Sequence, residues 1–308
     1  MQFFHTPNID FISKRRIAYA ISTALFAVGM ISLILRGGPN YGIDFKGGTS
    51  VVVRFESAVS TADLRSTLSE ADLGDSEISK FGAKNEFVIY IAQQKEASAS
   101  EMVDNVENAL TAGLDVPFEV LQEETVGPKI GAQLRSAMIL ACLIALLLIL
   151  IYISIRFELV FAVGAIVALF HDVLIILGIF SLLNFELSLK EIAAFLTIIG
   201  YSLNDTIVVY DRIRENLKVL RSEELPSLIN KSINQVLSRS VITSLTTFIV
   251  VFILFVAGGE VIKGFAFAML VGVVVGTYSS IYVASPLVLE WQVRHGGKRQ
   301  LRMVKKKK

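Results

Sequence analysis

Residues 192–210 read IAAFLTIIGYSLNDTIVVY, an apolar run in which Asp205 is the only charged side chain. An α-helix rises about 1.5 Å per residue, so roughly 20 apolar residues cross the hydrocarbon core of a bilayer. The run therefore predicts a membrane-spanning helix. An ionisable group inside such a helix is costly to insert, which makes Asp205 the first functional candidate of the chain.

Five further runs have a similar length and apolar character. They are Ile17–Leu35, Ala137–Ile155, Leu159–Leu183, Val241–Ala257 and Gly264–Leu289. The whole chain of 308 residues is 53% hydrophobic and only 19% charged, with a mean hydropathy of +0.61. We expect an α-helical polytopic membrane protein with six transmembrane helices, the last five of them within residues 136–290.

Basic residues set the expected orientation. With both termini in the cytoplasm, the cytoplasmic segments hold 18 Lys and Arg, whereas the two short outer loops hold 2. Because short loops rich in Lys and Arg stay inside, we expect a bacterial inner-membrane protein with both termini cytoplasmic. Residues 1–16 are then a cytoplasmic tail, residues 211–240 a connector of two short helices broken near Pro226, and residues 291–308 a basic cytoplasmic tail.

The two ends of the chain each allow a second interpretation. The run 17–35 follows three basic residues, as in a signal peptide, but its length and the poor cleavage site behind it predict an uncleaved anchor. The four lysines at 305–308 are interpreted as an orientation signal, and specific contact with anionic lipid is the alternative.

Residues 36–135 lie between the first and second spans and predict one small periplasmic domain. Strands are expected where β-branched and aromatic residues gather, and helices where apolar residues recur every three or four positions. The strands are Thr49–Glu56, Glu77–Phe81, Glu86–Ile91 and Pro117–Gln122, and the helices are Ser60–Ala71, with Ser60 as cap, and Ser98–Ala112. The order β-α-β-β-α-β predicts a ferredoxin-like α+β domain.

Signals of enzymatic chemistry are missing from the sequence. It has no phosphate-binding loop and no His-Glu-x-x-His motif, and Cys142 is its single cysteine. His5, His171 and His295 are too scattered to suggest a metal site. A net charge of +1 gives no reason to expect nucleic acid as a partner. We expect a protein that is not an enzyme, has no cofactor or metal, and draws energy from a partner or the membrane.

Polar residues form a stripe along the run that contains Asp205. Thr197, Tyr201 and Asp205 follow one another at four-residue spacing and share one helix face, with Asn204 beside it. Arg239 precedes the fifth span on the cytoplasmic side, and Thr243 continues its face. A long Arg side chain can reach inward, so we expect Arg239 to lie close enough to pair with Asp205.

An Asp–Arg pair at this depth has two interpretations. Burial disfavours the charged carboxyl and a nearby guanidinium favours it, so a small helix movement could switch protonation, as a relay requires. The alternative is a static pair that holds the fourth and fifth helices together. His171 and Asp172, in the middle of the third span, leave the same choice open between a relay and a structural polar contact.

Two other patterns predict structure rather than chemistry. Residues 272–276, GVVVG, predict close packing of the sixth span on a neighbouring helix. Charged residues of the outer loops are expected to be solvated; they are Glu186, Lys190, Glu191, Glu260 and Lys263.

Several stretches resemble the SecD/SecF family of protein-export membrane proteins, in the same order along the chain. YGIDFKGGT at 41–49 resembles the family's Gly-Ile-Asp-Phe-x-Gly-Gly signature, through Gly42, Asp44, Phe45, Gly47 and Gly48. GYSLNDTIVVYDRIREN at 200–216 resembles the fourth-span motif of the SecF branch. VGPKIG at 126–131, LSRSVITSLTT at 237–247 and YSSIYVASPL at 278–287 resemble further family segments.

The resemblance implies a function as well as a fold. Members of the SecF branch pair with SecD, form half of a transporter related to the RND superfamily, and assist the SecYEG channel. The resemblance implies that the H⁺ or Na⁺ gradient drives the unfolded polypeptide across the membrane, with Asp205 as the ion-linked carboxylate and Arg239 as its partner. Tyr201, Asn204, Thr243, His171 and Asp172 are further candidates for the ion path.

Besides SecD and SecYEG, the candidate partners are YajC, YidC, the translocating polypeptide and the lipid bilayer. Two rival functions remain open at this stage. Half of an exporter for small molecules or lipids would need a larger outer domain than about 100 residues can form. A scaffold without transport activity would not need a buried Asp beside an Arg.

Overall fold

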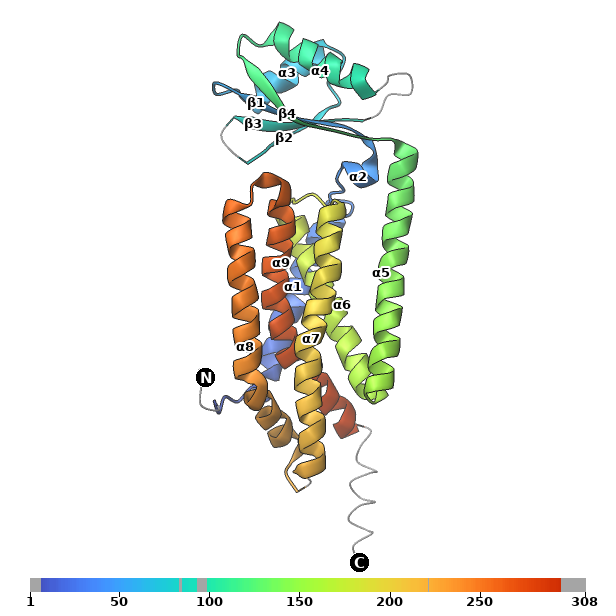
Figure 1. Ribbon diagram of the computed structural model, residues 1–308, viewed down its shortest axis with the longest axis vertical. Helices are drawn as coiled ribbons and strands as arrows, with labels where there is room; N and C mark the ends of the chain where they lie inside the picture. The colour runs from blue at the N-terminus through green and yellow to red at the C-terminus, as the bar shows by residue number, and fades with distance from the viewer. Residues whose placement is uncertain (1–6, 83–84, 93–98, 221, 295–308) are drawn as a thin grey trace, which may run out of the picture.

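The computed structural model describes residues 7–82, 85–92, 99–220 and 222–294. It consists of a long helix bundle and a small sheet domain at one end of that bundle (Figure 1). Residues 1–6 of the predicted N-terminal tail and residues 295–308 of the predicted basic tail lie outside the described residues.

Six helices of the described chain are long and apolar enough to cross a membrane, which confirms the predicted six-span architecture. They are α1 (Arg15–Leu35), α5 (Pro128–Arg156), α6 (Leu159–Leu183), α7 (Leu189–Val219), α8 (Leu225–Ala257) and α9 (Glu260–Ser279), which continues through a π-helical turn, η1 (Ser280–Ala284), to Arg294. Helix α5 stands beside the others and approaches α6 only towards its end far from the sheet domain (Figure 1).

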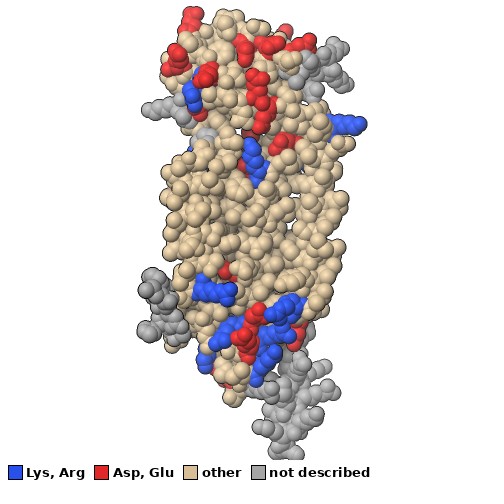
Figure 2. All heavy atoms as spheres, viewed as in Figure 1, with Lys and Arg blue, Asp and Glu red and all other residues tan. Residues whose placement is uncertain are grey.

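Charged residues are concentrated at the two ends of the molecule. Figure 2 shows a broad band of uncharged side chains between the acidic sheet domain and the basic far end of the bundle. The surface of this band is apolar, as shown by exposed side chains such as Leu147, Ile155 and Val250, which are 55%, 82% and 67% exposed. An apolar belt between two charged ends is what a bilayer requires of the protein surface.

The sheet domain is the predicted ferredoxin-like unit. It contains β1 (Gly48–Phe55), α3 (Thr61–Glu70), β2 (Glu77–Lys80), β3 (Glu86–Ile91), α4 (Ala99–Gly113) and β4 (Phe118–Val126). The strands form one antiparallel sheet in the order β2-β3-β1-β4, and both helices cover the face away from the bundle (Figure 1). Ser60 caps α3 as expected, because its Oγ accepts a hydrogen bond from the backbone N–H of Asp63.

The core of the sheet domain follows from strand alternation. Val51, Val53 and Phe55 of β1 point to the helix-covered face together with Ile89 of β3, and Leu64 of α3 packs against them. Each of these side chains is at most 2% exposed. This continuous core fixes the domain as a rigid unit at the end of the bundle.

A short segment ties the sheet domain to α7. The backbone N–H of Gly42 donates to Leu187 O at 2.9 Å, and Leu187 N donates to Asn40 O at 2.7 Å. Asp44 lies in the one-turn helix α2 (Ile43–Lys46). Its carboxylate accepts a hydrogen bond, 2.8 Å long, from the backbone N–H of Leu189, which is the first residue of α7. Phe45 is buried beneath the segment, at 6% exposure. The family-like motif therefore binds the N-terminus of a membrane helix.

The two glycines that end this segment have backbone angles that favour glycine. Gly47 and Gly48 have φ of 74° and 125°, and a Cβ on Gly47 would lie 2.8 Å from Pro128 Cα. The Tyr90 hydroxyl donates a hydrogen bond to Gly47 O. Burial, reinforced by the Glu77 carboxylate, raises the pKa of Tyr90, which keeps this hydroxyl a donor.

Two expectations need correction. The predicted connector 211–240 is not a pair of short separate helices, because α7 runs to Val219 and α8 already begins at Leu225. Pro226 lies in the first turn of α8, where its missing N–H costs nothing. Glu191 is buried rather than solvated, at 6% exposure, because its carboxylate completes a capping box with Ser188 at the start of α7.

Candidate functional site

Two carboxylates lie buried inside the bundle, at the positions that the sequence singled out. Asp172 of α6 is 1% exposed and Asp205 of α7 is 3% exposed. Burial of a carboxyl without compensation is strongly unfavourable, so the groups around each one decide what it does. Each carboxyl is held by hydroxyl groups from neighbouring helices.

Asp205 lies where α7, α8 and α9 meet. Ser244 of α8 donates from Oγ to Oδ2 of Asp205 at 3.2 Å. Thr277 Oγ1 of α9 lies 3.5 Å from the same oxygen, and its single hydrogen also has Val273 O of its own helix 2.8 Å away. The two hydroxyls are also 2.7 Å apart. Hydroxyls stabilise a carboxylate by hydrogen bonds but bring no positive charge. Among the described residues, Asp205 forms no ion pair with Lys, Arg or His.

The predicted pair between Asp205 and Arg239 is not formed in this structure. Arg239 is exposed on α8. The reason is the rotation of α8. Its buried face at this level carries Ser240 and Ser244, and Arg239 and Thr243 lie one residue, about 100°, away from that face.

The polar stripe on α7 is partly as predicted. Tyr201, one turn before Asp205, is half-buried, and its hydroxyl is enclosed. Asn204 is exposed and does not face the carboxylate. Thr197 donates to its own helix, at Ala193 O, 2.7 Å away. Of the predicted neighbours on α7, only Tyr201 thus lies on the side of Asp205.

Two enclosed hydroxyls continue the line on either side of Asp205. Neither Tyr201 OH nor Ser240 Oγ has a hydrogen-bond partner within the part of the chain that is described. Tyr201 is one turn from Asp205 towards the sheet domain, and Ser240 is one turn from Ser244 towards the far end. Leaving a buried hydroxyl unpaired costs about 1–3 kcal/mol, so a further hydrogen-bond partner at either hydroxyl would be favourable.

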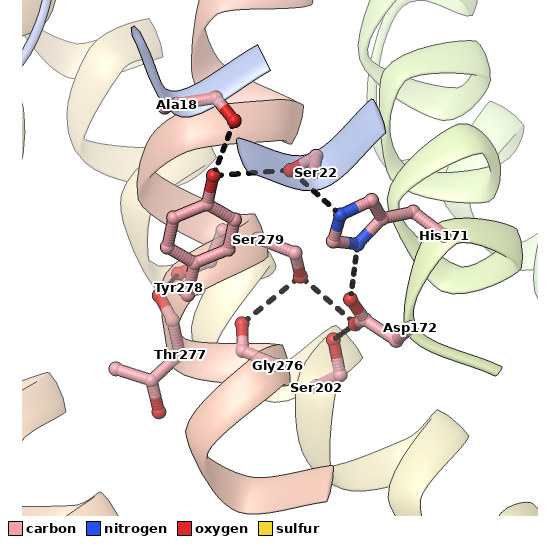
Figure 3. Close-up of polar contacts among 10 residues, drawn as sticks. Ala18, Ser22, His171, Asp172, Ser202, Gly276, Thr277, Tyr278 and Ser279 are labelled. Atoms are coloured by element: carbon pink, nitrogen blue, oxygen red, sulfur yellow. Dashed lines mark hydrogen bonds and ion pairs between the residues drawn. The ribbon is translucent and has the colours of Figure 1, made fainter. Parts of the chain in front are cut away.

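Asp172 lies in a second network, drawn in Figure 3. Its Oδ2 accepts hydrogen bonds from Ser202 Oγ of α7 at 2.6 Å and from Ser279 Oγ of α9 at 2.8 Å. Its Oδ1 is 2.9 Å from Nδ1 of His171, the preceding residue on α6. His171 and Asp172 therefore face the same network. This corrects the expectation that two neighbouring residues, which point about 100° apart on a helix, face different neighbours.

The network extends from His171 to α1. His171 Nε2 is 3.0 Å from Ser22 Oγ, which is 3.0 Å from the hydroxyl of Tyr278 on α9. That hydroxyl donates to the backbone carbonyl of Ala18 at 2.7 Å (Figure 3). The His171 and Tyr278 rings stack with centroids 6.1 Å apart. Four helices, α1, α6, α7 and α9, thus meet around one histidine and one carboxyl.

Close packing of α7 on α9 brings the two networks together. A small residue of α9 faces α7 on successive turns, at Gly264, Ala268, Gly272 and Gly276. A Cβ on Gly276 would lie 2.9 Å from Cβ of Ser202, and a Cβ on Gly272 would overlap the side chain of Ile198. The predicted packing role of residues 272–276 is confirmed.

The π-helical turn η1 begins directly after the part of α9 that serves both carboxyls. It runs over Ser280–Ala284, and Ser285 Oγ donates to Ser280 O at 2.8 Å. Such turns interrupt the regular hydrogen bonds of a helix and occur frequently at functional sites. Thr277, Tyr278 and Ser279 are therefore placed on the last regular turn before a break.

The hydroxyl partners of the carboxyls were missed by sequence reasoning. They are Ser202 and Ser279 at Asp172, and Ser244 and Thr277 at Asp205; Ser22 and Tyr278, which continue the network from His171, were missed as well. A usable signal existed for α8, because Ser240 and Ser244 have the same four-residue spacing as Arg239 and Thr243. No group of three His, Cys, Asp or Glu side chains that could hold a metal ion occurs among the described residues.

Comparison with known proteins gives a consistent picture. A sequence profile for "Protein export membrane protein SecD/SecF, C-terminal" matches residues 106–294, and one for the "SecD/SecF GG Motif" matches residues 32–59. The chain is 48% identical over 300 residues to the protein translocase subunit SecF of Desulfurispirillum indicum, covering 96% of this chain and 94% of that protein. It is 45% identical to the same subunit of Thermodesulfovibrio yellowstonii, covering 94% and 96%.

Solved structures of SecDF proteins have the same fold. The crystal structure of SecDF from Thermus thermophilus, described as a translocon-associated membrane protein, superposes with a TM-score of 0.85 at 42% identity. This chain matches over 93% of its own length and spans 39% of that chain. SecDF in a super-membrane-facing form gives a TM-score of 0.71 at 41% identity, with 98% and 41% covered.

Proposed function

The chain belongs to the SecD/SecF family of protein-export membrane proteins, and on that premise we propose that it acts as the SecF-type half of a SecD–SecF complex. The complex assists SecYEG in moving unfolded polypeptides across the bacterial inner membrane. The name shared by its relatives, protein translocase subunit, supports polypeptide export over the export of small molecules or lipids.

A SecD partner is supported by length and by surface. The chain corresponds to 39% of one SecDF chain and 41% of the other, which leaves room in those chains for a SecD part. Helices α5 and α8 also expose long apolar faces, with Leu148 and Ile253 both 59% exposed. A second helix bundle that packs on these faces would bury apolar surface and bring new groups towards Asp205.

The coupling ion binds at Asp205 in this proposal. The observation that carries it is a carboxyl, 3% exposed inside a membrane helix, which has hydroxyl partners but no cation within ion-pair distance among the described residues. A carboxylate in such a place is stable only when it takes up a proton or binds a cation. H⁺ is the first candidate, and Na⁺ is the second because Ser244 and Thr277 offer oxygen ligands.

The enclosed hydroxyls of Tyr201 and Ser240 provide entry and exit steps on either side of Asp205. Arg239 lies at the end of this line, and its charge can favour release of the ion once the helices move. Energy therefore comes from the ion gradient, and the chain itself catalyses no reaction. His171 and Asp172 form a separate part of the same machinery.

The orientation follows the charge distribution. We place the sheet domain in the periplasm, where it contacts SecD or the emerging polypeptide, and the basic far end of the bundle in the cytoplasm (Figure 2). YajC and YidC are further partners to be tested. Asp44 accepts a hydrogen bond from the start of α7, so the segment that contains Asp44 connects the periplasmic domain with the helix that carries Asp205.

The test is polypeptide export into inverted membrane vesicles that contain the complex, with the H⁺ and Na⁺ gradients collapsed separately. Collapse of the coupling gradient should reduce export to the level of vesicles that lack the chain. Asp205→Asn should give that low level with both gradients intact, because an amide cannot titrate. The control is Asp211→Asn, an exposed carboxyl near the cytoplasmic end, which should export normally. Normal export by Asp205→Asn would refute the proposal.

A further inference from the structure

The hydrogen bonds between α1 and His171 have only one possible direction. The Tyr278 hydroxyl is 2.7 Å from the Ala18 carbonyl oxygen, which can only accept, so the tyrosine donates its single hydrogen there. Its oxygen must then accept the hydrogen of Ser22. Because Ser22 has no second hydrogen to give, its contact with His171 Nε2 requires a proton on Nε2 (Figure 3).

At the opposite end of the network, Ser202 donates to Oδ2 of Asp172. Ser279 donates to the same oxygen through its shorter contact, 2.8 Å, whereas Gly276 O lies 3.1 Å from the same hydroxyl. The remaining contact, 2.9 Å between Asp172 Oδ1 and His171 Nδ1, is a hydrogen bond only if one proton lies between these atoms. That proton belongs either to a neutral acid beside a neutral imidazole or to an imidazolium beside a carboxylate. In both cases the pair has a net charge of zero.

The surroundings favour a neutral pair. The His171 side chain is 13% exposed and the Asp172 side chain 1%. No Lys or Arg of the described residues forms an ion pair with Asp172, and a net-neutral pair is far cheaper to bury than a lone charge. The titratable groups within the apolar parts of the spans packed around α6 are Tyr19 of α1, Cys142 and Tyr152 of α5, Tyr201, Asp205 and Tyr210 of α7, and Tyr278 and Tyr282 of α9 and its continuation. Further charged groups lie at the ends of these spans; they include Arg15, Arg16, Arg156, Lys190, Glu191, Asp211, Arg212, Arg214, Glu215, Lys218, Lys263, Glu290 and Arg294.

We propose that the His171–Asp172 pair is a second proton-binding site, separate from Asp205, which holds one exchangeable proton between Nδ1 and Oδ1. When the proton leaves, two lone pairs face each other across this contact and the hydrogen bond is lost. Asp172 stays bound to α7 and α9, whereas His171 stays bound to Ser22 of α1. Occupancy of the site therefore decides whether the hydrogen bond from His171 to Ser22 of α1 continues to Asp172, whereas the contacts of α1 through Ser32–Ser181 and Ala18–Tyr278 stay in both states.

The purpose of such a site rests on the proposed ion-driven function, whereas the proton position follows from the hydrogen bonds alone. The two sites share helices, because Ser202 and Asp205 lie one turn apart on α7, and Thr277 and Ser279 lie two residues apart on α9. A movement of α9 that follows ion binding at Asp205 would thus also displace the groups around the His171–Asp172 pair.

The experiment reads the histidine directly. The chain has 3 histidines, so His5→Gln with His295→Gln leaves His171 as the only one. The full-length chain, labelled with ¹⁵N-histidine and embedded in lipid vesicles, is measured by solid-state NMR across a pH series. We expect Nε2 to carry a proton at every pH and the Nδ1 resonance to move as the shared proton leaves. An unprotonated Nε2, or an Nδ1 resonance that does not move, would overturn the proposal.

Variants separate the contributions. Asp172→Asn should abolish the Nδ1 titration, and its persistence would overturn the proposal. Tyr278→Phe frees the hydrogen of Ser22, so a tautomer without a proton on Nε2 should appear, whereas Tyr282→Phe, the matched control, should give the unchanged spectrum. The absence of that tautomer in Tyr278→Phe would show that the hydrogen bond from Tyr278 to Ala18 O does not set the direction of the hydrogen bond between Ser22 and His171.

One further variant distinguishes this proposal from the proposed function. Asp205→Asn should leave the Nδ1 titration of His171 present, because Asp205 is not part of the shared-proton contact. Loss of the titration in this variant would show that the site is not separate and would overturn the proposal. Normal export by Asp205→Asn would refute the proposed function and leave the His171 spectrum as it is.

Discussion

At the residue scale, Asp205 differs from an ordinary buried ion pair. In a buried ion pair each charge is stabilised by the other, and separating the two charges is costly. Asp205 instead has two hydroxyl partners, and Arg239 is exposed and forms no ion pair with it. A carboxyl with neutral partners can exchange its proton or cation without breaking a salt bridge first.

We expect the charge of Arg239 to act on Asp205 from a distance in this structure. After a helix movement, Arg239 is expected to act on Asp205 at close range. Arg239→Met should fold and assemble, but export stimulation should be lost because Asp205 keeps its proton more readily without the cation. Arg239→Lys keeps the charge without the planar fork and should retain partial activity. The measurement is modification of Asp205 by a carbodiimide, which attacks protonated carboxyls, with mass spectrometry across a pH series.

In Arg239→Met the modification of Asp205 should extend to higher pH than in the unchanged protein. The control is Arg156→Met, since Arg156 pairs with Asp211, 3.2 Å away, and makes no contact with Asp205. Identical pH profiles for Arg239→Met and the unchanged protein would show that Arg239 and Asp205 are not coupled.

The candidate residues could be predicted, but not their partners. Asp172, His171 and Asp205 stand out in the sequence because charge is rare in apolar runs. Which side chains touch them depends on helix rotation, and an error of one residue turns a helix by about 100°. The sequence favoured the Arg239–Thr243 face of α8, whereas the structure buries the Ser240–Ser244 face. Serine and threonine are also common in apolar helices, where their hydroxyls can donate to the backbone of the same helix, as Thr197 does. Their presence in a sequence therefore does not identify them as partners of a carboxyl.

At the element scale, α9 is the helix that both sites share. Its small residues let α7 approach closely, and Thr277 and Ser279 then serve different carboxyls. The GVVVG pattern predicted close packing of α9 on a neighbouring helix but did not identify that helix. The reason is that a stripe of small residues can pack against many different helix surfaces. The order of strands and helices in the sheet domain was also predictable, since hydrophobic periodicity is local.

Gly272→Val tests the α7–α9 contact. The added side chain would overlap Ile198, and overpacking of a tight contact costs about 1–3 kcal/mol. We expect a lower Tm for the purified full-length chain and weaker export in vesicles. Gly200→Val is the matched control, because a Cβ there meets nothing within 4 Å, and it should leave both measurements near those of the unchanged protein. Equal Tm values for the two variants would contradict the role given to this contact.

At the scale of the whole molecule, the sheet domain and the buried carboxyl Asp205 are joined through one helix. The segment from Asn40 to Gly48 binds the start of α7, and Asp205 lies about four turns further along the same helix. Movement of α7 during ion binding would therefore displace the segment on which the sheet domain stands. This connection was not predictable from the sequence, because it joins residues about 145 positions apart.

The orientation can be tested by labelling single cysteines. Cys142→Ala removes the one native cysteine, and Ser66→Cys or Ser222→Cys then introduces an exposed thiol on α3 or in the turn before α8. A maleimide that cannot cross the membrane should label position 66 in intact spheroplasts and position 222 only in inverted vesicles. Labelling in the opposite pattern would invert the proposed topology.

The central claim, that Asp205 carries the coupling ion, is tested most directly by ion flux. The chain and SecD are reconstituted together in liposomes that contain a pH-sensitive dye, or a Na⁺-sensitive dye in a parallel series, and a gradient of the ion is imposed. We expect the unchanged complex and Asp211→Asn to dissipate one of the two gradients faster than protein-free liposomes do. Asp205→Asn should dissipate it no faster than protein-free liposomes. Flux through Asp205→Asn at the rate of the unchanged complex would show that Asp205 does not carry the coupling ion.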